Sequence, residues 1–97
     1  MKKLKHDQYL DELCEKISPG YDKLSTNVQL YSKKKKRKIA EIDIMAVRRG
    51  KVDIYEVKCS YRKTKAKKQL FRIKRLLPNI GTLFFFCGES GTLERIV

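Results

Sequence analysis

The sequence predicts an α/β domain whose elements follow the order α-β-β-β-α-β-β. Three observations predict this fold class. Two segments repeat apolar residues at helical spacing, two neighbouring segments alternate apolar and polar residues as strands do, and residues 83–87 are apolar on both sides, as a strand covered on both faces would be. The chain has 97 residues, 41% of them hydrophobic, which is enough for one small core. We therefore expect residues 1–97 to form a single domain.

The first part of the chain is expected to form a helix, a short strand and an exposed tip. Apolar residues recur at helical spacing over residues 4–17, and the tripeptide 18–20, Ser-Pro-Gly, ends this helix. A strand with alternating residues follows at 27–32. Positions 33–38 then hold six consecutive cations. Because such a run repels itself and cannot enter a core, it predicts an exposed hairpin tip.

The centre of the chain is expected to form a β-hairpin from residues 39–47 and 52–59, joined by a turn at 48–51. Gly50 supplies the positive φ of this turn. In the first strand, alternation places on one face Ala40, Ile42, Ile44 and Ala46. The other face carries Glu41, Asp43, Met45 and Val47. In the second strand, one face carries Val52, Ile54, Glu56 and Lys58. Together the two strands therefore place three acids and one lysine on a face that is otherwise apolar.

The last part of the chain is expected to add a second helix and two strands. Residues 64–77 carry an apolar stripe at helical spacing, and Pro78 closes this helix. The stripe consists of Ala66, Leu70, Ile73 and Leu77. The apolar run 83–87 predicts a central strand, and a turn at 88–91 leads to a last short strand at 92–97.

The charge balance favours a polyanionic partner. Twenty-four Lys and Arg against eleven Asp and Glu give a formal net charge of +13, far more than solubility requires. The apolar run 83–87 is much shorter than the roughly 20 residues that cross a bilayer, and no apolar segment of a signal peptide follows the basic start. The three cysteines are too widely spaced for a zinc site, and their odd number favours a reducing interior. We expect a cytoplasmic location and no membrane partner.

The register of the central hairpin brings acidic side chains together. A two-residue loop at 49–50 sets Asp43 opposite Glu56, and Glu41 opposite Lys58. Directly opposed side chains have Cβ atoms ~5 Å apart, so three acids and one lysine converge. Two close carboxylates repel unless a cation lies between them, and carboxylate oxygens are ligands that Mg2+ and Mn2+ prefer. From the residues alone, a metal site and an ordinary strand face with a Glu41–Lys58 ion pair explain this pattern equally well.

A family resemblance favours the metal site. The tripeptides Glu41-Ile42-Asp43 and Glu56-Val57-Lys58, in this order of elements, resemble the core motif of the PD-(D/E)xK nuclease superfamily. The chain is most similar to YraN-like proteins, archaeal Holliday junction resolvases and small archaeal viral nucleases, over roughly residues 4–87. In YraN-like chains a Gly-Tyr and an Asn precede the Glu-Ile-Asp, and residues 20–21 and Asn27 follow that order here.

The resemblance implies a fold and a chemistry. The fold is a restriction-endonuclease-like core, in which helices flank a mixed sheet. The activity is cleavage of DNA with Mg2+ (or Mn2+) held by Asp43 and Glu56, and Lys58 assists the attacking water. The location would be the host cytoplasm if the protein is viral.

Three positions depart from the superfamily pattern or extend it. Ile42 stands where the proline of the motif would be. The superfamily usually carries a further acidic metal ligand on the first helix, for which Asp7 is the match and Glu12 the competitor, although either could equally be a solvated acid. On the second helix Gln69 resembles the glutamine of a QxxxY motif, but Ile73 replaces the tyrosine. We count Gln69 among the candidate catalytic residues.

The single histidine, His6, has no partner arrangement for a histidine-based hydrolase and is expected to be a surface residue.

The basic residues predict the nucleic-acid surface. The candidate contacts are Lys33, Lys34, Lys35, Lys36, Arg37, Lys38, Arg62, Lys63, Lys67 and Lys68. No base-reading motif is evident, so we expect recognition of nucleic-acid shape and backbone. The expected function is a structure-selective endonuclease acting on junctions, flaps or single strands. Junction resolution requires a homodimer. The 83–87 strand or the last strand would suit the dimer interface if that strand lies at an edge of the sheet. The alternative is a non-catalytic basic nucleic-acid-binding module on the same fold, and RNA is not ruled out as the partner.

Overall fold

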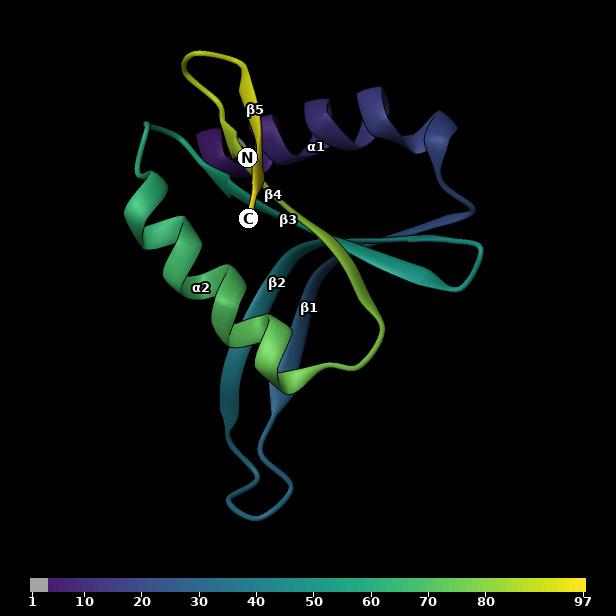
Figure 1. The fold of residues 1–97 in the computed structure, drawn as a ribbon. Coiled ribbons are helices and arrows are strands. Elements are labelled where there is room, and N and C mark those ends of the chain that lie inside the picture. Colours follow the sequence, from purple (N-terminus) through teal and green to yellow (C-terminus); the bar gives the residue numbers. More distant parts are fainter. Residues whose placement is uncertain (1–3) are drawn as a thin grey trace.

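The computed structural model describes residues 4–97 as five strands and two helices (Figure 1). The elements are α1 (Lys5–Ile17), a 3-10 turn η1 (Ser18–Gly20), β1 (Lys23–Tyr31), β2 (Lys38–Arg48), β3 (Lys51–Lys58), α2 (Lys63–Leu76), β4 (Ile80–Cys87) and β5 (Thr92–Ile96). The predicted order of helices and strands is confirmed. Within this part of the chain no helix is long and apolar enough to cross a membrane.

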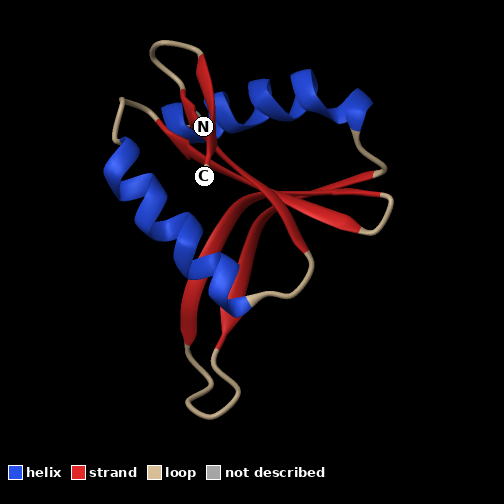
Figure 2. Ribbon diagram, in the orientation of Figure 1, coloured by secondary structure: helices blue, strands red, loops and turns tan. Residues whose placement is uncertain are grey.

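The strands form one mixed sheet in the order β1-β2-β3-β4-β5 (Figure 2). Neighbouring strands are antiparallel except β3 and β4, which run parallel because α2 carries the chain back between them. β4 lies inside the sheet, so it cannot offer the free edge that a dimer contact through it would need. Only β1 and β5 are edge strands of this sheet.

The two helices cover opposite faces of the sheet (Figure 2). α1 buries Leu10 and Leu13 against one face, and α2 buries Ala66, Leu70 and Ile73 against the other. β4 contributes to both cores: Phe85 enters the core under α2, and its neighbour Phe86 enters the core under α1. The apolar run at 83–87 therefore belongs to a strand that is covered on both faces, as predicted.

The alternation predicted for β2 is wrong at its middle. Ile42 packs in the core under α2, whereas Ile44 packs in the core under α1, so these two residues do not share a face. The change of face coincides with an irregular residue in the neighbouring strand β1. Thr26 pairs with Ile44 and Val28 with Ile42, but the intervening Asn27 has φ +52° and makes no register pair. Asparagine tolerates this left-handed backbone well. The irregularity lies opposite Asp43, where the strand changes face.

The ends of the strands also differ from the prediction. β1 begins at Lys23 instead of position 27, and β4 begins at Ile80 instead of position 83. The added residues of β1 are polar or half-exposed, so backbone pairing with β2 extends the strand without an apolar pattern. The six cations at 33–38 are all exposed and surround the tip of the β1–β2 hairpin, as predicted (Figure 1).

Candidate functional site

The candidate site lies where β2 and β3 separate. The register near the turn is the predicted one, with Arg48 opposite Lys51. Among the described residues, the backbone pairs of these two strands end at Ile44 and Tyr55. The predicted Glu41–Lys58 pair is therefore wrong, and Asp43 is not paired directly with Glu56 through the backbone. Beyond Tyr55, β3 continues only in its parallel ladder with β4.

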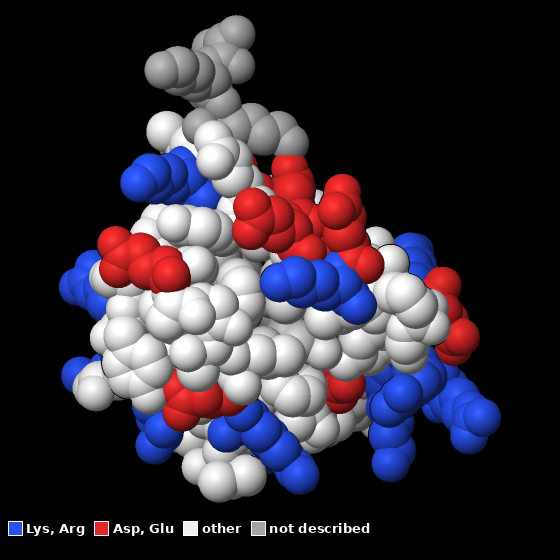
Figure 3. Space-filling view, turned by 90° about the horizontal axis from the view of Figure 1, so that it is seen from above, with Lys and Arg blue, Asp and Glu red and all other residues white. Residues whose placement is uncertain are grey.

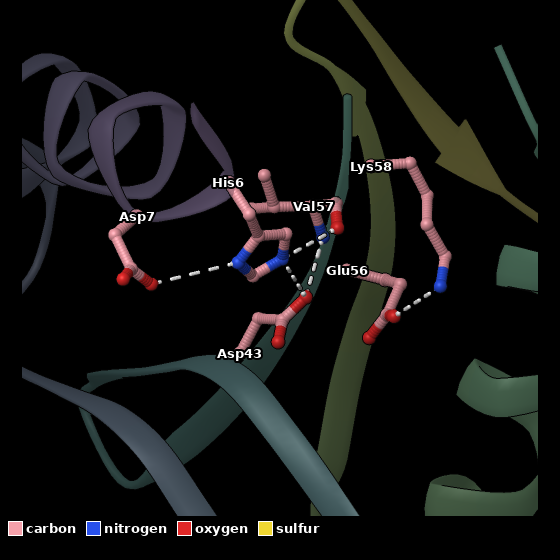
Figure 4. A network of polar contacts seen from close by, with 6 residues as sticks. All are labelled: His6, Asp7, Asp43, Glu56, Val57 and Lys58. Carbon is pink, nitrogen blue, oxygen red and sulfur yellow. Dashed lines mark hydrogen bonds and ion pairs between the residues drawn. The ribbon is translucent and has the colours of Figure 1, made fainter. Parts of the chain in front are cut away.

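The side chain of Asp43 connects β2 to β3 beyond the last backbone pair of these two strands. Its Oδ2 accepts a hydrogen bond of 2.8 Å from the backbone N–H of Val57, the residue between Glu56 and Lys58. The Asp43 carboxylate therefore joins β2 to β3 in place of a backbone bond. Asp43 is only 9% exposed, so this carboxylate is held in a fixed position beside the Glu56 side chain (Figure 4).

Glu56 is a buried acid with an incomplete set of partners. It is 3% exposed, and its Oε2 lies 3.3 Å from Lys58 Nζ. Its Oε1 is buried and accepts no hydrogen bond from any residue in the 4–97 range. Burial raises the pKa of Glu56 to about 8, and the nearby Asp43 carboxylate adds to the rise, while Lys58 opposes it. The site thus holds two carboxylates, and Lys58 is paired with only one of them.

His6 is half-buried, with 35% of its side chain exposed, and it is not the free surface residue that was expected. Its Nε2 lies 3.0 Å from the carbonyl oxygen of Val57 and 3.4 Å from Asp43 Oδ2 (Figure 4). A carbonyl oxygen can only accept, so Nε2 carries the proton and donates it. His6 therefore links α1 to the end of β3 beside Asp43. The helical spacing could have revealed this position, because His6 precedes Leu10 by four residues and Leu13 by seven, on the buried stripe of α1.

The two acids proposed for the first helix are placed differently. Asp7 Oδ1 lies 3.8 Å from His6 Nδ1, so this acid stands beside the site, on the far side of the imidazole (Figure 4). Glu12 lies further along α1 and is exposed. Of the two, Asp7 is the acid that the fold brings toward Asp43 and Glu56.

Gln69 and Glu41 lie together between β2 and α2. Both line a cavity of about 180 Å³ between β2 and α2, and Arg72 lines the same cavity. Glu41 forms an ion pair of 3.2 Å with Lys38 on its own strand. Within residues 4–97 no hydrogen bond or ion pair links Gln69 to Glu56 or Lys58.

The residues of the site fit a small divalent cation. No three His, Cys, Asp or Glu side chains in the described range form a closed metal cluster. Mg2+ does not need one, because it usually binds one or two carboxylates and keeps several waters. Asp43 and Glu56 supply two carboxylates, and the unpaired, buried Oε1 of Glu56 is an acceptor that a cation would satisfy. Asp43 and Glu56 are therefore the residues that could hold a divalent cation.

The cations predicted to bind nucleic acid fall into two groups. The run 33–38 is exposed at the β1–β2 tip. Arg62, Lys63 and Lys68 line a cavity of about 480 Å³ at the start of α2, together with Tyr61, which is 56% exposed. Lys63 is also paired with Glu94 at 3.0 Å, so its charge is partly neutralised, and Lys67 is half-buried. On the face seen in Figure 3, several acidic side chains form a cluster beside one basic side chain, further acidic side chains are scattered around it, and most lysines and arginines lie along the rim.

Comparison of the chain with protein-family models, curated proteins and solved structures found no match. The function must therefore be inferred from the motif and from the geometry of the site.

Proposed function

We propose that the protein is a divalent-metal-dependent nuclease that cleaves phosphodiester bonds of DNA, built on a restriction-endonuclease-like core. The observation that carries the proposal is the Glu56 carboxyl group. It is buried beside the second buried acid, Asp43, and one of its oxygens lacks a partner among residues 4–97. Without a bound cation such an arrangement costs stability once Glu56 is ionised, since each carboxylate has left water and then faces a like charge. A fold retains a costly pair of this kind where it serves a site.

Each residue of the site has a distinct role in this proposal. Asp43 and Glu56 hold Mg2+ or Mn2+, which when bound polarises a phosphate oxygen and lowers the pKa of a water. The backbone N–H of Val57 keeps the Asp43 carboxylate in place. Lys58, whose ammonium group lies beside Glu56, donates a hydrogen bond to the attacking water or to a phosphate oxygen as negative charge grows there. His6 and Asp7 act as positioning residues behind Asp43.

The surroundings of the site support a nucleic-acid substrate. Exposed cations at 33–38 and at the start of α2 would neutralise backbone phosphates, and the exposed Tyr61 ring could stack on an unpaired base. These contacts favour branched or single-stranded DNA over a uniform duplex. Resolution of four-way junctions would in addition need a homodimer, for which the edge strand β5 is the remaining candidate interface.

A cleavage panel tests the proposal. Duplex, single-stranded, flap and four-way-junction DNA, with matching RNA, would be incubated with Mg2+, Mn2+ or EDTA. We expect metal-dependent cleavage by the wild type and a loss of at least about 100-fold in Asp43→Asn and Lys58→Met. Asn keeps an oxygen for the Val57 N–H, so folding is preserved. Glu41→Gln is the matched control and should cleave normally. If the wild type cuts no substrate with any metal but still binds in a salt-sensitive way, the protein is a non-catalytic nucleic-acid-binding module.

The salt dependence of binding tests the basic surface. If ~6 phosphates are contacted, log affinity should fall with log salt at a slope near −5. Replacing Lys34, Lys35 and Lys36 by Ser should make this slope shallower by about 2 to 3, because each lost phosphate contact removes about 0.9. Fluorescence anisotropy with a labelled DNA measures the slope. A variant with Lys16, Lys23 and Lys74 replaced by Ser loses the same charge outside the proposed surface and should keep the wild-type slope. An equal change in both variants would contradict a defined contact surface.

A further inference from the structure

A second cationic site lies at the opposite end of the sheet from the buried acids. A cavity of about 640 Å³ opens beside the β2–β3 turn, and four cations line it: Arg48, Arg49, Lys51 and Arg95. Lys51 and Lys58 stand at the two ends of β3, and a strand rises by about 3.3 Å per residue, so this cavity is roughly 20 Å from Lys58. It therefore cannot be part of the Asp43–Glu56 site.

Among the described residues, the only acid that lines this cavity is already engaged. Asp53 Oδ2 accepts a hydrogen bond of 2.6 Å from the Tyr21 hydroxyl, and its Oδ1 accepts one of 2.8 Å from the backbone N–H of Thr82. Asp53 thus fastens the start of β4 and the segment before β1 to β3. In the described part of the chain, none of the four cations forms an ion pair. Arg48 donates a hydrogen bond of 3.4 Å to the carbonyl oxygen of Gly20, which leaves its charge uncompensated. One carboxylate against four cations leaves the cavity with an excess of positive charge.

The backbone also keeps the cavity open. Gly81 lines it, and a Cβ at this position would lie 2.7 Å from Asp53 Oδ1, which the Thr82 N–H holds in place. The glycine lets β4 approach Asp53 closely and leaves no side chain in the cavity. Arg48 is positioned as well, with its guanidinium 5.6 Å from the centre of the Tyr21 ring.

We propose that this cavity binds a phosphate group. Guanidinium groups match phosphate oxygens with paired hydrogen bonds, and three arginines and a lysine converge here. The volume suits a ligand larger than a single phosphate ion. The phosphate belongs either to the backbone of a nucleic acid or to a small phosphorylated molecule, and both present the same oxygens. This inference does not depend on the proposed nuclease activity, because it uses none of the residues of the acidic site.

Titration with pyrophosphate, followed by amide NMR in the presence of EDTA and at low salt, tests the proposal. The amide signals of Lys51, Thr82 and Arg95 should shift and saturate. The double variant Lys51→Ala/Arg95→Ala should bind at least about tenfold more weakly, since two charged donors are lost. The control Lys34→Ala/Lys36→Ala loses the same charge and should bind as the wild type does. The single variant Arg49→Ala should also weaken binding, which provides a second test if the double variant is unstable.

A second arm of the experiment identifies the source of the phosphate. If a short single-stranded DNA shifts the same amides and displaces pyrophosphate, the cavity binds nucleic-acid backbone. If only pyrophosphate shifts them, it binds a small phosphorylated molecule. Shifts spread over all basic residues, or equal weakening in both double variants, would overturn the proposal. Because EDTA prevents metal-dependent cleavage, a failure here is independent of any failure of the nuclease proposal.

Discussion

Replacing Glu56 by Gln is expected to abolish metal-dependent cleavage and, in the absence of metal, to make the protein more stable above neutral pH. Few substitutions at a functional site raise stability, so the combination is diagnostic. It follows from the position of Glu56, which is 3% exposed and lies beside Asp43, with one oxygen unpaired among residues 4–97. Gln has nearly the same shape but carries no charge, so it removes the like-charge repulsion together with the proposed metal ligand.

The sign of the pH dependence follows from the direction of the pKa shift. Burial, reinforced by Asp43, raises the pKa of Glu56 in the folded protein to about 8, from an ordinary value of 4.5. Between these two values the folded state holds more protons than the unfolded state, so stability falls as pH rises. The loss begins near the unfolded pKa and is complete above the folded one. Its size is on the order of 5 kcal/mol. The Gln variant lacks this contribution, so its stability should change less across the same window.

Urea unfolding in EDTA, at about pH 5 and about pH 9, measures this difference. The wild type should lose stability between the two conditions, and Glu56→Gln should lose much less. Glu41→Gln is the control, because Glu41 is partly exposed and paired with Lys38, and this variant should follow the wild type. Adding Mg2+ at the higher pH should restabilise the wild type but not Glu56→Gln, since a ligand that binds only the folded state stabilises it. Parallel losses in the wild type and in Glu56→Gln would contradict the assigned burial of a charge.

The fold could be predicted for the elements whose apolar residues repeat because one or both of their faces are buried. The stripes of the two helices and the apolar run of β4 are such patterns, and these elements formed as expected. The change of face within β2 could not be predicted, because Ile42 and Ile44 are both apolar and suit either core. The change of face in β2 coincides with the left-handed backbone at Asn27 in the neighbouring strand β1. The spacing of apolar residues within β2 does not indicate this change of face.

The site could be predicted only in part, for a related reason. The turn fixed the hairpin register near Gly50, but not how far the pairing of β2 and β3 extends. That limit depends on β4, which pairs with β3 as far as Lys58 and holds it while β2 departs. Gln69 was proposed from its resemblance to the glutamine of the QxxxY motif, and in the structure it lines a cavity together with Glu41. His6 was misplaced because it was judged as an isolated ionisable group and not as a member of the buried stripe of α1.

Replacing Gly88 by Ala is expected to destabilise the protein by on the order of 3 kcal/mol and to weaken cleavage as well. A Cβ at this position would lie 2.1 to 2.6 Å from atoms of the Tyr9 ring, which packs against the core under α1. The ring is half-buried, and the backbone N–H of Gly88 is held by the carbonyl oxygen of Lys58 at 2.8 Å, so neither side can yield cheaply. The relief would come from displacement of α1, which carries His6 away from Asp43.

A double-mutant cycle separates this contact from a general effect of losing a glycine. Gly20→Ala is the control, because a Cβ there meets nothing within 4 Å, and it should be neutral or slightly stabilising. Tyr9→Ala should itself cost stability through the lost ring, yet Gly88→Ala added to it should cost little more, so the two changes should couple strongly in urea unfolding. If the effects of Gly88→Ala and Tyr9→Ala simply add, the ring does not lie against Gly88. In that case α1 would be free to shift without moving β4, and the contacts of His6 with Asp43 and Val57 would depend on the helix alone.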